Sequence, residues 1–151
     1  MLAAADDIPG VVRVINAAYE VEKFFVSGDR TNEETVRRLM TKGAFLVARV
    51  EGGLAGCVYV ELRNPRAYFG MLSVEPSRQG TGLGRRLVDE AEQYARDHGC
   101  DAMDIRVVNL RTELLPFYGK LGYVERATEP VDDPRALQPF HFVLMSKVLT
   151  R

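Results

Sequence analysis

Apolar positions in the first forty residues recur at helical spacing and predict two helices. The first should begin at Asp6 or Asp7, with Pro9 in its first turn, where a missing N–H costs little. The second should run from about Thr31, a suitable N-cap residue, to Met40. The positions of the first helix that would face the core are Ile8, Val12, Ile15 and Tyr19.

Later in the chain, six segments have the apolar, β-branched character of strands. Gly52-Gly53 lies between the first two segments and is a tight-turn signal, so they should form a hairpin. Pro76 ends the third, because proline cannot donate a hydrogen bond to a neighbouring strand. The predicted strands are residues 44–50, 54–62, 67–74, 103–108, 123–126 and 140–149.

Two more helices are predicted, a long one after the third strand and a short one over residues 114–121. Gly99 is well placed to end the long helix in a left-handed conformation, and Gly122 to end the short one. The apolar stripe of the long helix is Leu83, Leu87, Val88, Ala91, Tyr94 and Ala95. This order of elements predicts a mixed α/β fold with one central sheet, and 151 residues fit a single domain over 1–151.

Composition and charge narrow the function by exclusion. Hydrophobic residues make up 46% of the chain, charged residues 27%, and the formal net charge is -1. This balance argues against bulk electrostatic binding of nucleic acid or an anionic membrane. No apolar run approaches the ~18 residues of a membrane span, and the amino terminus lacks a signal-peptide pattern. Cys57 and Cys100 have no metal or redox spacing, so we expect reduced cysteines, no metal site and a cytoplasmic protein.

The most informative segment is the glycine-rich stretch between the third strand and the long helix. Gly80, Gly82 and Gly84 lack Cβ atoms, so consecutive backbone N–H groups can converge on a small concavity there. The helix start adds unpaired N–H donors and a partial positive charge. Such a place suits phosphate or pyrophosphate, although a merely tight turn would also use glycines. Three arginines supply full charges nearby: Arg78, Arg85 and Arg86.

Two common nucleotide-binding motifs do not fit this stretch. A P-loop ends in Gly-Lys-Ser/Thr, whereas Gly84 is followed by Arg85-Arg86. A Rossmann fingerprint reads G-x-G-x-x-G after an early strand, whereas this loop reads G-x-G-x-G after the third strand. A protein that uses the loop to bind ATP is therefore the least favoured interpretation.

Three segments resemble the GNAT superfamily of acetyl-CoA-dependent N-acetyltransferases. The run from Gln79 to Gly84 (QGTGLG) matches the family signature Q/R-x-x-G-x-G/A. Residues 71–76 (MLSVEP) are similar to the family's cofactor strand and its proline exit, and residues 117–123 (FYGKLGY) to its FYxKLGF/Y segment. The likeness covers nearly all of the chain. It implies a largely antiparallel central sheet flanked by about four helices, and transfer of an acetyl group from acetyl-CoA to a primary amine.

The resemblance also implies roles for individual residues. Main-chain groups of the cofactor strand would pair with the pantetheine arm, and a backbone N–H there would polarise the thioester carbonyl. Tyr118 would be the general acid that protonates the leaving thiolate, although its spacing alone fits a core tyrosine equally well. The residues that the resemblance assigns to acetyl-CoA are Leu72, Ser73, Val74, Arg78, Gln79, Gly80, Thr81, Gly82, Leu83, Gly84, Arg85 and Asn109.

Two features depart from the family pattern. The family's first strand should precede the helix start at Asp6, where only five residues stand, so that strand should be short or missing. In many members the asparagine after the fifth strand lies seven residues before the tyrosine. Asn109 and Tyr118 are nine residues apart, which weakens the assignment of Asn109.

The general base and the acceptor stay open at this point. The cofactor strand offers no carboxylate ahead of the loop, and a lone histidine in a strand is more often structural. The conceivable bases are Glu61, Tyr59, Glu22 and His141. The acceptor side could be walled by Tyr19, Glu22, Phe24, Phe25, Arg30, Tyr68 and the loop around Arg135. These residue types suit a small amine and a peptide terminus equally.

Two further questions have alternatives. The missing strand carboxylate would also fit a non-catalytic module that binds or senses acyl-CoA. The chain could act as a monomer or as a homodimer, since an exposed last strand could pair with a second copy.

Overall fold

The computed structural model describes residues 1–150 of the chain and centres on one six-stranded sheet. The strand order is β1-β2-β3-β4-β6-β5, and every neighbouring pair except β3 and β4 is antiparallel. This confirms the predicted mixed α/β fold. The strands are β1 (Ala44–Val50), β2 (Gly53–Arg63), β3 (Arg66–Val74), β4 (Ala102–Val108), β5 (Val124–Pro130) and β6 (His141–Val148).

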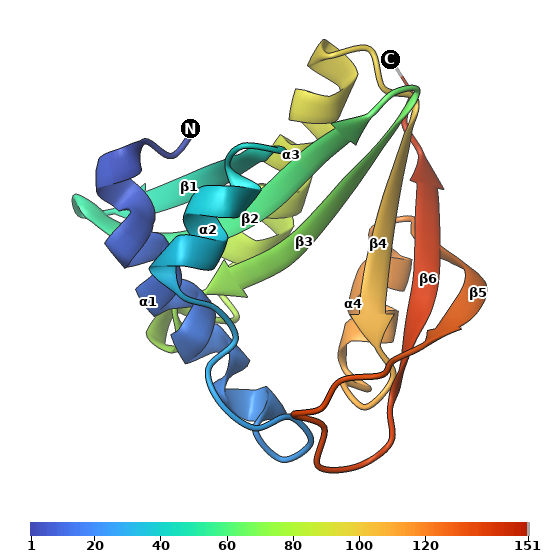
Figure 1. The fold of residues 1–151 in the computed structure, drawn as a ribbon. Helices are drawn as coiled ribbons and strands as arrows, with labels where there is room; N and C mark the ends of the chain where they lie inside the picture. The colour runs from blue at the N-terminus through green and yellow to red at the C-terminus, as the bar shows by residue number, and fades with distance from the viewer. Residues whose placement is uncertain (151) are drawn as a thin grey trace.

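Helices cover both faces of the sheet, as Figure 1 shows. The first two lie over one face of β1 to β3, and the third and fourth pack on the opposite face. None of the helices within residues 1–150 combines the length and apolar character needed to span a bilayer. The helices are α1 (Ile8–Ala18), α2 (Glu33–Leu39), α3 (Leu83–Asp97) and α4 (Leu114–Lys120), with 3-10 turns at Ala5–Asp7, Tyr19–Glu22 and Pro76–Arg78.

The alternation of side chains along the central strands builds two separate cores. Phe45 and Cys57 point toward α1 and pack with Ile15, whereas Val58 on β2 points to the other face and packs with Leu87 of α3. All five are at most 1% exposed. A strand with buried side chains on both faces reads as a continuous apolar run, which explains why residues 54–60 show no polar alternation.

Three predicted boundaries need correction. The hairpin turn is Glu51-Gly52, with φ of 54° and 81°, and Gly53 already belongs to β2. Two left-handed residues match the twist of a two-residue hairpin. The N-cap of α2 is Asn32, whose side chain accepts a hydrogen bond from the Thr35 N–H at 2.9 Å, and not Thr31, which is buried. β5 runs to Pro130 and not to 126, because exposed polar residues hide its pairing with β6.

The amino terminus supplies a short substitute for the strand that the sequence appeared to lack. Leu2 forms an antiparallel bridge with Leu46 of β1. The Ala3 N–H donates to the Phe45 carbonyl at 2.8 Å, and the Val47 N–H donates to the Met1 carbonyl at 2.8 Å. The free edge of β1 is therefore partly covered by the chain itself.

The two parallel strands meet at one end and separate at the other. The pairs are Arg66–Ala102, Ala67–Met103 and Tyr68–Asp104. Beyond Tyr68 the strands diverge like the arms of a V (Figure 1), and no strand within residues 1–150 pairs with the β4-facing edge of β3. This open edge lies at the centre of the molecule.

A bulge shapes β3 where it lines this opening. Cys57 pairs with Ser73, and Tyr59 pairs with Gly70, so β3 has an extra residue at this point. Met71 takes up the bulge with a φ of 54°, a conformation that non-glycine residues seldom adopt. Such bulges re-aim neighbouring main-chain groups, and strained residues of this kind concentrate at functional sites.

Charged side chains hold the two arms together near the point where they join. The Arg66 Nε donates to the Asp104 Oδ2 at 2.8 Å across the β3–β4 junction. Glu92 of α3 is 2% exposed, and its carboxylate accepts from the Tyr123 hydroxyl at 2.8 Å and from the Lys147 Nζ at 2.9 Å. A buried carboxylate needs such partners, so this cluster fixes α3 against β6.

Candidate active site

The glycine loop presents an uninterrupted row of free main-chain donors. Gly80 has a φ of 80° and Gly82, the N-cap of α3, a φ of 85°. Within residues 1–150 the N–H groups from Gly80 to Arg85 donate no hydrogen bond, and the first amide of the helix that does is that of Arg86, to the Gly82 carbonyl at 3.1 Å. The Thr81 hydroxyl donates to the Arg78 carbonyl at 2.6 Å and fixes the loop. This geometry suits an anionic group.

A cavity of about 240 Å³ lies between this loop, the open edge of β3 and α4. It brings together six of the residues predicted to bind acetyl-CoA: Leu72, Val74, Arg78, Gln79, Gly80 and Gly84. The remaining walls come from Ala18, Tyr19, Arg111, Glu113, Leu114 and Phe117. A Cβ at Gly84 would make only ordinary van der Waals contacts, with Phe117 at 3.7 Å and Val74 at 3.8 Å, so packing alone does not require glycine there.

Other predicted residues have different surroundings. The Ser73 side chain is buried on the far face of β3 and donates to the Met71 carbonyl at 3.0 Å. Leu83 is a core residue at 8% exposure, so only its N–H could reach a ligand, and Arg85 is exposed on the first turn of α3. The Asn109 Oδ1 accepts from the His141 N–H at 2.8 Å and thereby joins β4 to β6. Ligand roles for these residues stay predictions.

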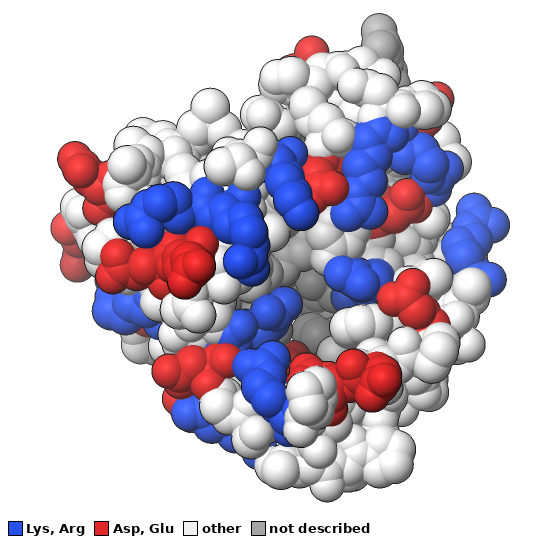
Figure 2. All heavy atoms as spheres, in the orientation of Figure 1, with Lys and Arg blue, Asp and Glu red and all other residues white. Residues whose placement is uncertain are grey.

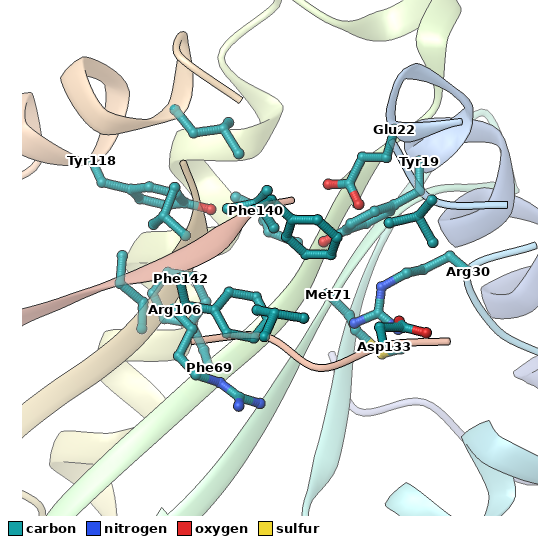
Figure 3. A pocket seen from close by; sticks show the side chains of 18 of the residues that line it. Tyr19, Glu22, Arg30, Phe69, Met71, Arg106, Tyr118, Asp133, Phe140 and Phe142 are labelled. Carbon is teal, nitrogen blue, oxygen red and sulfur yellow. The ribbon is translucent and has the colours of Figure 1, made fainter. Parts of the chain in front are cut away.

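A second cavity, of about 210 Å³, continues from the first along the opening between β3 and β4. Figure 2 shows this hollow near the centre of the molecule, with basic side chains gathered around it. The two cavities share Tyr19, Leu72 and Leu114. The side chains labelled on its walls in Figure 3 are Tyr19, Glu22, Arg30, Phe69, Met71, Arg106, Tyr118, Asp133, Phe140 and Phe142.

Two tyrosine hydroxyls extend into this second cavity from opposite sides. Tyr118 of α4 and Tyr19 at the end of α1 point toward the space between them (Figure 3). The Tyr118 hydroxyl has no hydrogen-bond partner among residues 1–150, although the residue is only 7% exposed. Burial raises the pKa of Tyr118 well above its usual range, and burial raises the pKa of Tyr19 to about 12. Both phenols therefore carry their protons at neutral pH.

Of the four conceivable bases, Glu22 is the one that reaches this cavity. Its carboxylate lies 2.9 Å from the Arg111 Nη1. Burial raises the pKa of Glu22, and the hydrogen bond and charge of Arg111 offset part of this rise. A carboxylate with a raised pKa is a better proton acceptor than an ordinary one.

The remaining three candidates point elsewhere or serve the sheet. The Tyr59 hydroxyl donates to the Glu61 Oε2 at 2.7 Å, and Tyr59 packs in the core under α1. Glu61 also accepts from Arg63 at 2.8 Å. The His141 carbonyl accepts a hydrogen bond from the Asn109 N–H at 3.0 Å. Neither cavity is lined by His141, Tyr59 or Glu61.

Several lining residues carry no signal in the sequence. Arg111 comes after β4 in a turn, and its partner Glu22 lies 89 positions earlier in the chain. Arg106 stacks over the rings of Tyr68 and Phe142, with its Cζ 5.5 and 4.9 Å from their centroids. Only the folded chain brings these groups together. Within residues 1–150 no cluster of three or more His, Cys, Asp or Glu side chains could hold a metal ion.

Comparison with known proteins relates the sequence to one family. The sequence model described as "Acetyltransferase (GNAT) family" matches residues 13–123. Mycothiol acetyltransferase of Propionibacterium freudenreichii is 26% identical over 131 residues, which cover 82% of this chain and 42% of that protein. The chain spans about a third to a half of the length of the curated relatives it matches.

Solved structures give the same relation at the level of the fold. The ribosomal-protein-S18-alanine N-acetyltransferase of Escherichia coli superposes with a TM-score of 0.84 at 15% identity, over 100% of this chain and 93% of that one. The yncA protein of Salmonella typhimurium, solved with its cofactor acetyl-CoA, gives a TM-score of 0.78 at 18% identity, over 100% and 93%. At these identities the likeness establishes a shared fold.

Proposed function

The chain belongs to the acetyltransferase (GNAT) family, and on that premise we propose that it transfers the acetyl group of acetyl-CoA to a primary amine. The single observation that carries the proposal is that the two cavities adjoin. The cavity at the glycine loop, which suits a phosphate-bearing ligand, shares Tyr19, Leu72 and Leu114 with a cavity lined by a free phenol and a carboxylate. One ligand can therefore be held at the loop and react at the far end.

The residues of the first cavity fit the chemical parts of acetyl-CoA. The free N–H groups from Gly80 to Arg85, with Arg78 beside them, suit a pyrophosphate. The open edge of β3 from Phe69 to Val74 offers main-chain groups to an extended, amide-containing arm, much as a missing strand would use them. Acetyl-CoA supplies the acetyl group as a thioester, which reacts with amines once its carbonyl is polarised.

We assign two proton transfers to side chains of the second cavity. The amine nitrogen forms a bond to the acetyl carbon while the carbon–sulfur bond breaks. The Tyr118 hydroxyl donates its proton to the leaving sulfur, and the proton lost by the amine nitrogen goes to Glu22. The free hydroxyl of Tyr118 and the raised pKa of Glu22 support these roles. Net charge on the chain is restored when Glu22 passes its proton to water and Tyr118 regains one.

The energetic cost of the proton transfer from Tyr118 is modest. An ordinary phenol and a thiol differ by about 1.5 pKa units, which corresponds to roughly 2 kcal/mol. Burial raises the pKa of Tyr118 further. Burial penalises a thiolate in the same cavity for the same reason, so the difference between the two groups changes less than either value.

The test combines binding and turnover. We expect acetyl-CoA and CoA to raise the melting temperature at ligand concentrations well above micromolar. We also expect free thiol to appear when the protein is incubated with acetyl-CoA and a panel of amines, with acetylated amine found by mass spectrometry. Stabilisation without thiol release on any amine would favour a non-catalytic acyl-CoA-binding module. Absence of both effects would refute the proposal.

A further inference from the structure

Two loops close over the outer side of the second cavity and are joined by main-chain hydrogen bonds. Val26 pairs with Ala136 as an isolated antiparallel bridge. The Ser27 N–H donates to the Arg135 carbonyl at 2.9 Å, and the Leu137 N–H donates to the Phe25 carbonyl at 2.8 Å. Segments more than a hundred residues apart therefore form a short two-stranded contact.

Side chains strengthen this closure. Phe25 is fully buried, and its ring lies 5.0 Å from that of Phe140, centroid to centroid. The Arg135 Nη1 donates to the Asp29 carbonyl at 3.0 Å, and the Gln138 Nε2 donates to the Phe24 carbonyl at 3.3 Å. An extended peptide would have to break these contacts to pass between the loops. The closure therefore favours an acceptor that fits whole within the cavity.

The size of the cavity leads to the same conclusion. Its volume of about 210 Å³ is below the roughly 300–1,000 Å³ typical of pockets for drug-sized ligands. Aromatic and aliphatic side chains line much of it, among them Phe69, Met71 and Phe142. An acceptor of a few heavy atoms fits such a space, and a longer chain does not.

Positively charged side chains outnumber negatively charged ones on the walls of the second cavity. Three arginines and two carboxylates line it. Arg106 lies 3.4 Å from Glu129, Arg135 lies 3.5 Å from Asp133, and Glu22 is paired with Arg111. That leaves Arg30, which has no carboxylate within 4.0 Å among residues 1–150, although its charge acts on Asp133 beside it (Figure 3) and on Glu22.

The position of Arg30 is suited to a ligand. Its guanidinium lies 5.3 Å from the centroid of the Tyr19 ring and is directed into the cavity, across from Tyr118 (Figure 3). Stacking on a ring holds the side chain in place, and a guanidinium fork binds carboxylate or phosphonate oxygens two at a time. An anion bound to the Arg30 guanidinium would lie across the cavity from the Tyr118 hydroxyl, the proposed proton donor.

We propose that the acceptor is a small amine that also carries an anionic group, as free amino acids do, and that Arg30 binds this group. This inference rests on the proposed acetyl transfer. With its anionic end on Arg30, the acceptor would direct its amine toward Glu22 and Tyr118. The same contact would disfavour protein amino termini. In a polypeptide the carboxyl group of the first residue forms a peptide bond, so no anionic group lies next to the amine.

The test compares matched acceptors at fixed acetyl-CoA. One set contains free amino acids and aminophosphonates, the second the corresponding amino acid amides, and the third tripeptides with the same first residue. We expect kcat/KM to be at least tenfold higher for the first set. Arg30→Gln should lower kcat/KM about 10- to 100-fold for the first set and leave the amides nearly unchanged. Arg38→Gln, an exposed arginine of α2 outside both cavities, is the control.

Binding of the same probes in the presence of CoA, measured by calorimetry, provides a readout that does not depend on turnover. We expect heat of binding from the free amino acid or aminophosphonate and a large loss in Arg30→Gln. Equal use of amides or tripeptides, or an Arg30→Gln variant with unchanged preference, would overturn the inference while the acetyl transfer stands. Whether the carboxylates or the phosphonates bind better identifies the anionic group. Failure to bind acetyl-CoA would instead overturn the proposed function on which the inference rests.

Discussion

In the proposed function, the two halves of the cleft recognise their ligands by different means. On the glycine-loop side, the binding groups would be main-chain N–H groups and a strand edge, which come from one continuous stretch between residues 69 and 85. On the acceptor side, the groups are side chains from segments far apart in the chain, which only folding brings together. Main-chain recognition depends on local conformation, whereas side-chain recognition depends on tertiary contacts. A site of the first kind can therefore be identified in a sequence far more readily than one of the second.

The largest effect on turnover is expected from Tyr118, near the place where the two halves of the cleft meet. Tyr118→Phe should lower kcat by about 100- to 10,000-fold, the range for loss of a general acid, with little change in the Kd of acetyl-CoA. Tyr19→Phe is the matched control, because it removes the same atom from the opposite wall. Its loss should be under about tenfold. Full turnover in Tyr118→Phe would exclude the general-acid role, and a larger loss in Tyr19→Phe would assign the role to Tyr19.

The next effect separates main-chain binding from simple backbone strain. Gly82 and Gly99 have φ of 85° and 83°, and open space surrounds the added Cβ at each. Valine at either position should destabilise the fold by about 1–2 kcal/mol, since both need a left-handed conformation. Gly82→Val alone should also weaken acetyl-CoA binding, about 10- to 100-fold, because it displaces the free N–H groups.

Melting curves with and without acetyl-CoA measure both quantities at once. An equal ligand-induced shift in the two variants would mean that the loop does not bind the cofactor. That result would remove the distinction between the two halves, because the glycines would then serve only the turn.

The smallest effect concerns the acceptor side and depends on pH. Glu22 can accept a proton only when ionised, and burial raises its pKa. The acidic limb of kcat/KM should therefore lie above the pH expected for an ordinary glutamate, with activity lost as the pH falls. Arg111→Gln removes the group that lowers this pKa, so the limb should move to higher pH by about one unit.

Two controls accompany the pH profile. Glu22→Gln should lower activity and remove this limb, and Arg38→Gln should leave the profile as in the wild type. A profile that does not move in Arg111→Gln would show that another group accepts the proton.

The sequence predicted the sheet and the glycine loop because both impose strict local demands. A φ near 80° at Gly80 and Gly82 nearly dictates the residue type, and apolar spacing marks α3 directly. The corrections arose where local demands are weak. Asn32 and Thr31 are both good N-caps, so only the buried contact of Thr31 with Asn16 decides between them.

The acceptor side could not be predicted in the same way. Tyr19 fits a core helix face by its spacing, yet the structure places it on the walls of both cavities. Glu22 was one of four possible bases, and its distinction depends on Arg111 in a distant turn. Polar residues of β5 suggested a loop, although pairing with β6 makes them a strand. In each case the deciding partner is far away in the sequence.

The short junction between β3 and β4 has a mechanical consequence. Three residue pairs and the Arg66–Asp104 contact join the arms at one end. At the opposite end the Glu22–Arg111 ion pair and the Val26–Ala136 bridge join them again. The cleft is thus a frame closed at both ends, and the distance between β3 and β4 is fixed at each end by contacts that lie outside the space between the strands. Substitutions at Arg66 or Asp104, remote from the reacting groups, should therefore change the width of the cleft.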